Sequence, residues 1–205
     1  MGLIDDQSLS DSSDEQLLGR YRQGDIQAFT VLVDRYRQEL FNFLARTFNN
    51  RSLADDAFQE TFLQVHLSAD SFDITRRFRP WLFTIAMNKA RDQLRRSNRR
   101  ETVSLSTPLR SGQDEKGTFV DLMEMDIPLP DEFAQQQESR ELVQEVITGL
   151  PSQLREVLLL AYFHRFSYKQ IAEMVAVPVG TVKSRLHTAV GTFAKRWKSR
   201  FEGQI

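Results

Sequence analysis

SYKQIAEMVAVPVGTVKSRLHTAV, residues 167–190, has the pattern of two short helices joined by a tight turn. Ser167 is a good N-cap for a first helix, in which apolar residues recur every three to four positions. That pattern stops before Pro178, whose fixed φ suits the first turn of a second helix. These features predict a helix-turn-helix, with a first helix over 167–175 and a second over 178–199.

The second helix is expected to have two chemically different faces. Its buried side is predicted from apolar residues at helical spacing, which are Val182, Leu186, Ala189, Val190, Phe193 and Trp197. On the opposite side, short polar side chains would let the backbone approach base edges while flanking cations neutralise phosphates. The residues expected to contact duplex DNA there are Thr181, Lys183, Ser184, Arg185, His187 and Thr188. A solvated hairpin face is the alternative, but the near absence of acid favours DNA binding.

The net charge of -1 hides four blocks of alternating sign. Residues 76–100 carry a net charge of +8 and residues 163–200 a net charge of +7. In contrast, residues 1–75 carry -7 and residues 101–145 carry -8. Two basic blocks separated by an acidic one indicate two contacts with a polyanion, joined by a segment that avoids it or mimics it. Ordinary mixed surface charge is the alternative, but blocks this pure favour nucleic acid at both.

Helical spacing recurs along the chain and no strand signal is convincing, so the sequence predicts an all-α fold. Besides the helix-turn-helix, the expected helices are 13–22, 25–47, 53–68, 79–97, 134–149 and 151–164. Residues 101–133 are rich in proline, glycine and acids, a composition typical of flexible linkers. We therefore expect two small helical domains, 1–100 and 134–205, joined by an acidic linker over 101–133, with the helix-turn-helix in the C-terminal domain.

Several classes of protein are disfavoured by what the sequence lacks. It has no cysteine, which removes a disulfide framework, a thiolate metal site and a cysteine nucleophile. No run of residues is long and apolar enough to span a membrane, and the first ten residues do not resemble a secretory signal. We expect a cytoplasmic protein without membrane insertion and without a cofactor.

Aromatic residues alternate with arginines in the first basic block. The apolar stripe of the helix expected there consists of Leu82, Phe83, Ala86, Ala90 and Leu94. Trp81 does not join it but lies with Asn88 on the polar side. Unstacked bases need flat aromatic surfaces and cations, and an amide can read the edge of an extruded base. The residues of this predicted single-stranded site are Trp81, Asn88, Lys89 and Arg91. For Trp81 alone, packing against the preceding loop beside Phe72 and Phe78 is an equal alternative.

An acidic face is expected on the helix over 53–68. Its predicted buried stripe consists of Leu53, Ala57, Phe58, Thr61, Phe62 and Val65. The residues left exposed on the other side are Asp55, Asp56, Gln59 and Glu60. Because such a face repels DNA and attracts a basic protein surface, it is a candidate docking face for a protein, with a plain solvated face as the alternative.

These three elements, in this order, resemble the extracytoplasmic-function group of bacterial RNA polymerase sigma factors, within the sigma-70 family. The resemblance covers nearly the whole chain. ADDAFQETFLQVH, residues 54–66, is similar to the helix with which that family binds the clamp coiled coil of core RNA polymerase. The resemblance implies core contacts by Asp56, Gln59 and Glu60. His66 departs from the tryptophan that the family often has at its position.

The other two motifs imply promoter contacts. RPWLFTIAMNKARDQLRR, residues 79–96, is similar to the helix and preceding loop that melt and read the minus-ten element, with Asn88 at the base-capturing position. LPSQLREVLLLAYFHRFSYKQIAEMVAVPVGTVKSRL, residues 150–186, is similar to the domain that reads the minus-thirty-five element. Of the outer residues, Lys183, Ser184 and Arg185 match the family motif. His187 and Thr188 fall at its variable positions.

The resemblance implies a dissociable subunit that initiates transcription while the polymerase performs the catalysis. The implied partners are core RNA polymerase, through its clamp coiled coil and flap, and promoter DNA, both duplex and single-stranded. An anti-sigma factor is a further candidate partner. The first alternative function is a stand-alone helix-turn-helix regulator. The second is a metal-dependent hydrolase built on Asp55, Asp56, Glu60 and His66, which the lack of any Glu-x-x-His pair disfavours.

Overall fold

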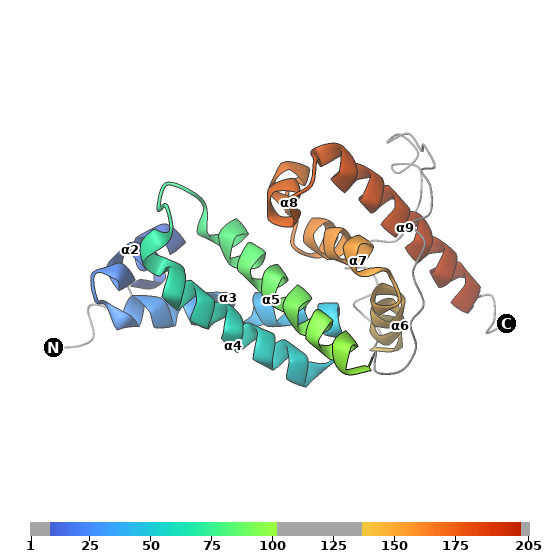
Figure 1. The fold of residues 1–205 in the computed structure, drawn as a ribbon, viewed down its shortest axis with the longest axis horizontal. Coiled ribbons are helices and arrows are strands. Elements are labelled where there is room, and N and C mark those ends of the chain that lie inside the picture. Colours follow the sequence, from blue (N-terminus) through green and yellow to red (C-terminus); the bar gives the residue numbers. More distant parts are fainter. Residues whose placement is uncertain (1–8, 102–136, 202–205) are drawn as a thin grey trace. The chain divides into compact units, whose positions relative to one another are not determined.

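The computed structural model describes residues 9–101 and 137–201, and it is helical without strands in these ranges (Figure 1). The helices of the first range are α2 (Asp14–Arg22), α3 (Ile26–Phe48), α4 (Arg51–Ser68) and α5 (Phe78–Glu101), with a 3₁₀ turn, η1 (Ala69–Ser71). Those of the second are α6 (Gln137–Thr148), α7 (Ser152–Leu158), α8 (Tyr168–Val175) and α9 (Val179–Phe201), with a π-helical turn, η4 (Leu159–Phe163). The prediction of an all-α fold is confirmed.

The chain divides into two compact units, residues 1–94 and 95–205. The expected linker, residues 101–133, lies outside the described residues apart from its first position. The expected start of the sixth helix at residue 134 lies outside them as well, and α6 is described from residue 137.

Local capping explains where the helices of the first unit begin. Ser13 and Gln16 form a capping box at the start of α2, in which each side chain accepts the other residue's backbone N–H. Asp25 caps α3 and Asn50 caps α4, each by accepting a backbone N–H three residues later. These side chains satisfy N–H groups that a helix leaves without internal partners.

Packing of α2, α3, α4 and α5 forms the core of the first unit, and it modifies the predicted stripes. In α4 the buried members of the stripe are Ala57, Thr61, Phe62 and Val65, joined by Ala54, whereas Leu53 and Phe58 are half-buried. In α5 the stripe is buried at Leu82, Phe83, Ala86 and Ala90 and half-buried at Leu94. Met87 and Gln93 are also buried. Burial in α5 therefore extends beyond one stripe, because the helix is covered by neighbours on more than one side.

The second unit contains the predicted helix-turn-helix. Ser167 and Gln170 form a capping box at the start of α8, and α8 is followed by its C-cap residue Ala176, which has a left-handed backbone with φ of 54°. In α9 the residues Val182, Leu186, Ala189 and Val190 are buried as predicted. Phe193 and Trp197 are half-buried and stack with ring centroids 5.9 Å apart. The helix expected over 151–164 differs, since α7 ends at residue 158 and continues as the π-helical turn.

Candidate nucleic-acid interface

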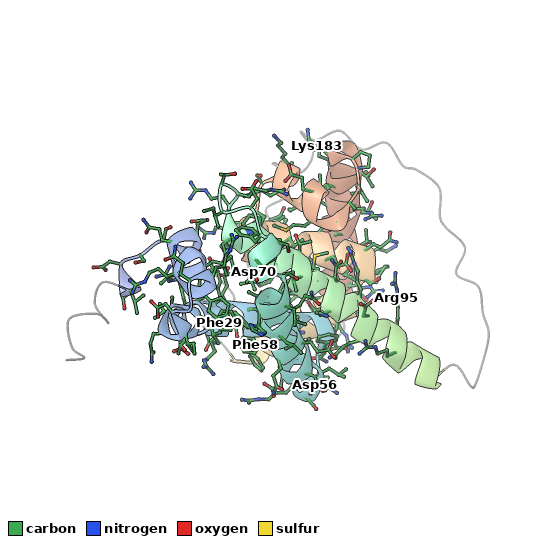
Figure 2. All side chains as sticks on the ribbon, turned by 60° about the vertical axis from the view of Figure 1, so that its left-hand side comes forward. Phe29, Asp56, Phe58, Asp70, Arg95 and Lys183 are labelled. Atoms are coloured by element: carbon green, nitrogen blue, oxygen red, sulfur yellow. The ribbon has the colours of Figure 1, made fainter. Side chains whose placement is uncertain are left out.

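The first half of α9 has an outer face of small polar and basic side chains. Lys183, Ser184 and Thr188 are exposed, and Figure 2 shows Lys183 extending away from the helix. Two hydroxyl groups on this face are held by the helix backbone, since Ser184 donates to the Thr181 carbonyl (3.1 Å) and Thr188 to the Ser184 carbonyl (3.0 Å). This fixes where their oxygens lie while leaving lone pairs free to accept from a base edge or phosphate-bound water.

The remaining predicted residues of this face are less exposed. Thr181, Arg185 and His187 are half-buried. The Nδ1 atom of His187 is buried and has no hydrogen-bond partner among the described residues. Of the two ring nitrogens of His187, only Nε2 can therefore form a hydrogen bond with a ligand.

Trp81 packs into the loop that precedes α5, as one of the two alternatives for this residue predicts. Its ring lies 4.4 Å from the ring of Phe72 and 5.7 Å from that of Phe78, measured between centroids. The indole is nevertheless only half-buried. The two phenylalanines cover part of the ring, and part of the residue remains accessible to solvent.

The other three residues of the predicted single-stranded site differ in accessibility. Asn88 is exposed, whereas Lys89 and Arg91 are half-buried. The ammonium group of Lys89 donates to the side-chain oxygen of Gln64 in α4 (3.1 Å). Lys89 is thus bound to the α4 side of the helix, and Asn88 is the most accessible polar group of the four.

The loop over residues 73–77 completes this surface. All five of its residues, Asp73, Ile74, Thr75, Arg76 and Arg77, are exposed. The loop is folded on itself, because one oxygen of Asp73 accepts both the N–H (3.0 Å) and the hydroxyl (2.8 Å) of Thr75. These two bonds lower the pKa of Asp73 below its ordinary range. The acidic group of the loop is therefore engaged within it, while its two arginines are exposed.

The acidic face of α4 is also formed. Asp55, Asp56 and Gln59 are exposed, and Figure 2 shows Asp56 near the N-terminal end of α4. Glu60 is half-buried, which corrects the expectation that it is fully exposed. Two leucines that the sequence analysis did not assign extend the same face, Leu63 with an exposed fraction of 57% and Leu67 with 68%. Their spacing of four residues on the exposed side was the available signal.

The described residues contain neither a metal-ligand cluster nor a membrane-spanning helix. Within residues 9–101 and 137–201, no three histidine, aspartate or glutamate side chains come together in a way that could hold a metal ion, so the group around Asp55 and His66 is not brought together as a site. No helix in those same ranges has the length and apolar character needed to cross a membrane.

Two family models match this chain, one in its N-terminal part and one in its C-terminal part. The chain matches the family model of Sigma-70 region 2 over residues 32–100 and that of Sigma-70, region 4 over residues 140–191. The first range holds most of α3, α4, the loop and α5. The second holds most of α6, all of α7 and α8, and the outer face of α9.

Relatives match over most of the chain. It is 32% identical over 166 residues to the ECF RNA polymerase sigma factor SigW of Bacillus subtilis, covering 81% of this chain and 87% of that protein. It is also 32% identical over 181 residues to the RNA polymerase sigma-H factor of Pseudomonas aeruginosa, covering 88% and 92%. The fold matches the sigma factor RpoE solved in complex with the anti-sigma factor NepR from Bartonella quintana, with a TM-score of 0.62, 22% identity and coverage of 83% and 96%. The chain belongs to the extracytoplasmic-function RNA polymerase sigma factors, the DNA-binding proteins that initiate transcription.

Proposed function

We propose that this chain binds core RNA polymerase as a dissociable subunit and recognises the minus-thirty-five and minus-ten elements of its promoters. It would then promote separation of the two DNA strands. The observation that carries the proposal is the order of the two sigma-70 regions on one chain, each with an exposed surface suited to one state of DNA. The polymerase, and not this chain, would perform the catalysis. Residues 1–100 and 134–205 would divide the two tasks, with residues 101–133 joining them.

Recognition of the duplex would belong to α9. With its first half in the major groove, Ser184 and Thr188 lie where short side chains permit close approach to base edges. Lys183 and Arg185 supply positive charge for the phosphates on either side. His187 would contribute through the outer edge of its ring. These residues, with Thr181, are the proposed minus-thirty-five contacts.

Capture of separated bases would belong to α5 and the loop before it. Melting costs on the order of 1–2 kcal/mol per base step, and stacking on an aromatic side chain returns about 1–3 kcal/mol per base. The open part of the Trp81 ring provides such a surface, and the exposed Asn88 amide can bond to the edge of a base. Arg91 and Lys89 would add positive charge at the margin. Lys89 would do so from a position beside Gln64, to which it is hydrogen-bonded.

Binding to the polymerase would use the exposed face of α4. Asp56 and Gln59 offer acceptors to a basic partner, and the exposed Leu63 and Leu67 add apolar area beside them. A surface that combines charge with exposed leucines favours a protein partner over nucleic acid, because phosphates are repelled by the carboxylates. We assign this face, with Glu60, to the clamp coiled coil, and the C-terminal unit to the flap.

The stand-alone regulator is disfavoured because it leaves the region 2 match over residues 32–100 without a task. We place the protein in the cytoplasm, where a bacterial polymerase acts. The solved RpoE was bound to an anti-sigma factor, and we propose an inhibitor of that class for this chain.

A binding assay tests the assignment of the polymerase as partner. The purified chain is mixed with core RNA polymerase and the complex is separated by gel filtration. Co-elution that is weakened by Asp56→Arg but not by Asp11→Arg would support the proposal, since both substitutions reverse one exposed acidic charge and only Asp56 lies on α4. Failure of the wild-type chain to co-elute would show that it does not act with the polymerase.

A further inference from the structure

The exposed loop over residues 73–77 is bounded by two buried phenylalanines. Phe72 has an exposed fraction of 6% and Phe78 of 0%, and their rings meet edge to face with centroids 6.2 Å apart. Trp81 packs on both. Because Trp81 packs on the residues at both ends of the loop, the positions of Phe72 and Phe78 determine the position of its ring.

One helix holds the backbone at both ends of the loop. The guanidinium group of Arg22 donates to the carbonyl of Phe72 (3.3 Å), and the carboxylate of Glu15 accepts the backbone N–H of Phe78 (3.0 Å). Both side chains come from α2. They are seven residues apart, which places them on the same face of a helix about two turns from each other. The face of α2 thus spans the loop, from the residue before it to the residue after it.

The bond from Phe78 replaces an ordinary helix cap. Phe78 is the first residue of α5, so its N–H has no partner within the helix. A carboxylate from another helix satisfies it, and a negative charge is favourable at a helix N-terminus. Glu15 therefore acts as a cap for α5, a role that a serine or aspartate next to the helix in sequence usually has.

α2 is itself anchored to α3 beside this point. Asp14 accepts hydrogen bonds from Arg35 (2.6 Å) and from the hydroxyl of Tyr36. The ring of Tyr36 in turn contacts Phe78, with centroids 5.6 Å apart. These contacts hold α2 in place against α3. Because α2 is fixed, its bonds to Phe72 and Phe78 restrict the position of the loop.

We propose that Glu15 and Arg22 are positioning residues for strand capture, which hold the loop over residues 73–77 and Trp81 in the arrangement that receives a separated base. This inference rests on the proposed function of α5. It assigns a part in promoter opening to α2, a helix that precedes the region 2 match at residue 32. A loop that is already ordered loses less conformational entropy when it binds DNA.

The test measures promoter opening by the holoenzyme, with a fluorescent base placed in the minus-ten element of a promoter mapped by overexpressing the chain. Glu15→Ala and Arg22→Ala are each expected to slow opening by about threefold to tenfold, the range expected for loss of one hydrogen bond to the backbone of the loop. Glu15→Gln is expected to open within about twofold of wild type, because its amide oxygen can still accept the Phe78 N–H. Binding to core polymerase should change by less than about twofold for all three.

Asn50→Ala is the matched control for stability. It removes the cap of α4 in the same unit without touching the loop or α2, since Asn50 bonds to Leu53. Wild-type opening speed in Glu15→Ala and Arg22→Ala, or an equal loss in Asn50→Ala, would overturn the inference. If Glu15→Ala does not fold, Arg22→Ala decides by the same criteria. A wild-type holoenzyme that opens no promoter would instead contradict the proposed function itself.

Discussion

The indole of Trp81 packs on the ring of Phe72, with centroids 4.4 Å apart and an angle of 36° between the ring planes. This contact joins α5 to the loop before it, yet it leaves Trp81 half-buried. One side chain can thus hold the loop in place and offer a surface to a base, so its two tasks must be separated by experiment.

Trp81→Ala is expected to lower the free energy of unfolding by about 1–3 kcal/mol, because a half-buried indole loses only part of its packing. Trp81→Phe keeps most of that packing and should cost about 1 kcal/mol or less. Both should open promoters more slowly than wild type, since phenylalanine offers a smaller stacking surface. Urea unfolding and the fluorescent-base assay measure the two effects. Full opening activity in Trp81→Ala would show that the ring is only structural.

Asn88→Ala is expected to change the free energy of unfolding by less than about 0.5 kcal/mol, because the side chain is exposed. Opening should nevertheless fall by about tenfold, which corresponds to about 1.4 kcal/mol for a lost bond to a base. Asn42→Ala makes the same chemical change on an exposed position of α3 and serves as the control. Equal opening by the two variants would remove Asn88 from the proposed site.

Lys183→Ala is expected to weaken binding of the holoenzyme to duplex promoter DNA and to reduce the slope of log affinity against log salt by about one. Lys195→Ala removes the same charge from an exposed position farther along α9 and should have a smaller effect. Filter binding or anisotropy over a series of salt concentrations measures both slopes. The assignment of the first half of α9 to the duplex fails if the Lys195 variant has the larger change.

Ala176→Gly is expected to raise the free energy of unfolding by about 0.5–1 kcal/mol. Ala176 has φ of 54°, a left-handed backbone that a side chain disfavours and glycine adopts freely. Ala194→Gly, the same substitution inside α9, should lower stability by about 1 kcal/mol. The opposite signs should appear in urea midpoints. A loss of stability in Ala176→Gly would contradict the left-handed turn.

The contribution of Glu15 to stability should depend on pH. Burial raises its pKa, but hydrogen bonds from the Phe78 N–H, its own N–H and the Ser13 side chain outweigh this and hold the pKa below its ordinary value of 4.5. The stabilising effect of the carboxylate is therefore complete above pH 4.5 and is lost as the pH falls through the lowered pKa. The difference in stability between wild type and Glu15→Gln should shrink from about pH 6 to about pH 3. A constant difference across that range would exclude this linkage.

Short-range signals predicted much of this fold. The cap at Ser167, the break near Pro178 and the apolar spacing in α9 are all local features, and the helix-turn-helix follows from them. The π-helical turn over Leu159–Phe163 was not predicted. The spacing of its apolar residues fits an α-helical turn as well as a π-helical turn, which contains one more residue.

Long-range contacts explain what the sequence could not reveal. The bond between Glu15 and Phe78 joins residues 63 positions apart, and nothing in the neighbourhood of either residue indicates its partner. Lys89 could be placed beside the polar face of α5 by helical spacing, but its bond to Gln64 depends on how α4 and α5 pack. The partial burial of Glu60 has the same origin, since helical spacing predicts a face but not its neighbours.

Reconstituted transcription tests whether this chain supplies promoter specificity. Purified core RNA polymerase is incubated with and without the chain on a template that carries a start site mapped after overexpression, and the run-off product is measured. We expect a transcript of defined length only when the chain is present, and its loss with Lys183→Ala combined with Asn88→Ala. A chain that binds the template alone but yields no specific transcript with core polymerase would contradict its function as a sigma factor.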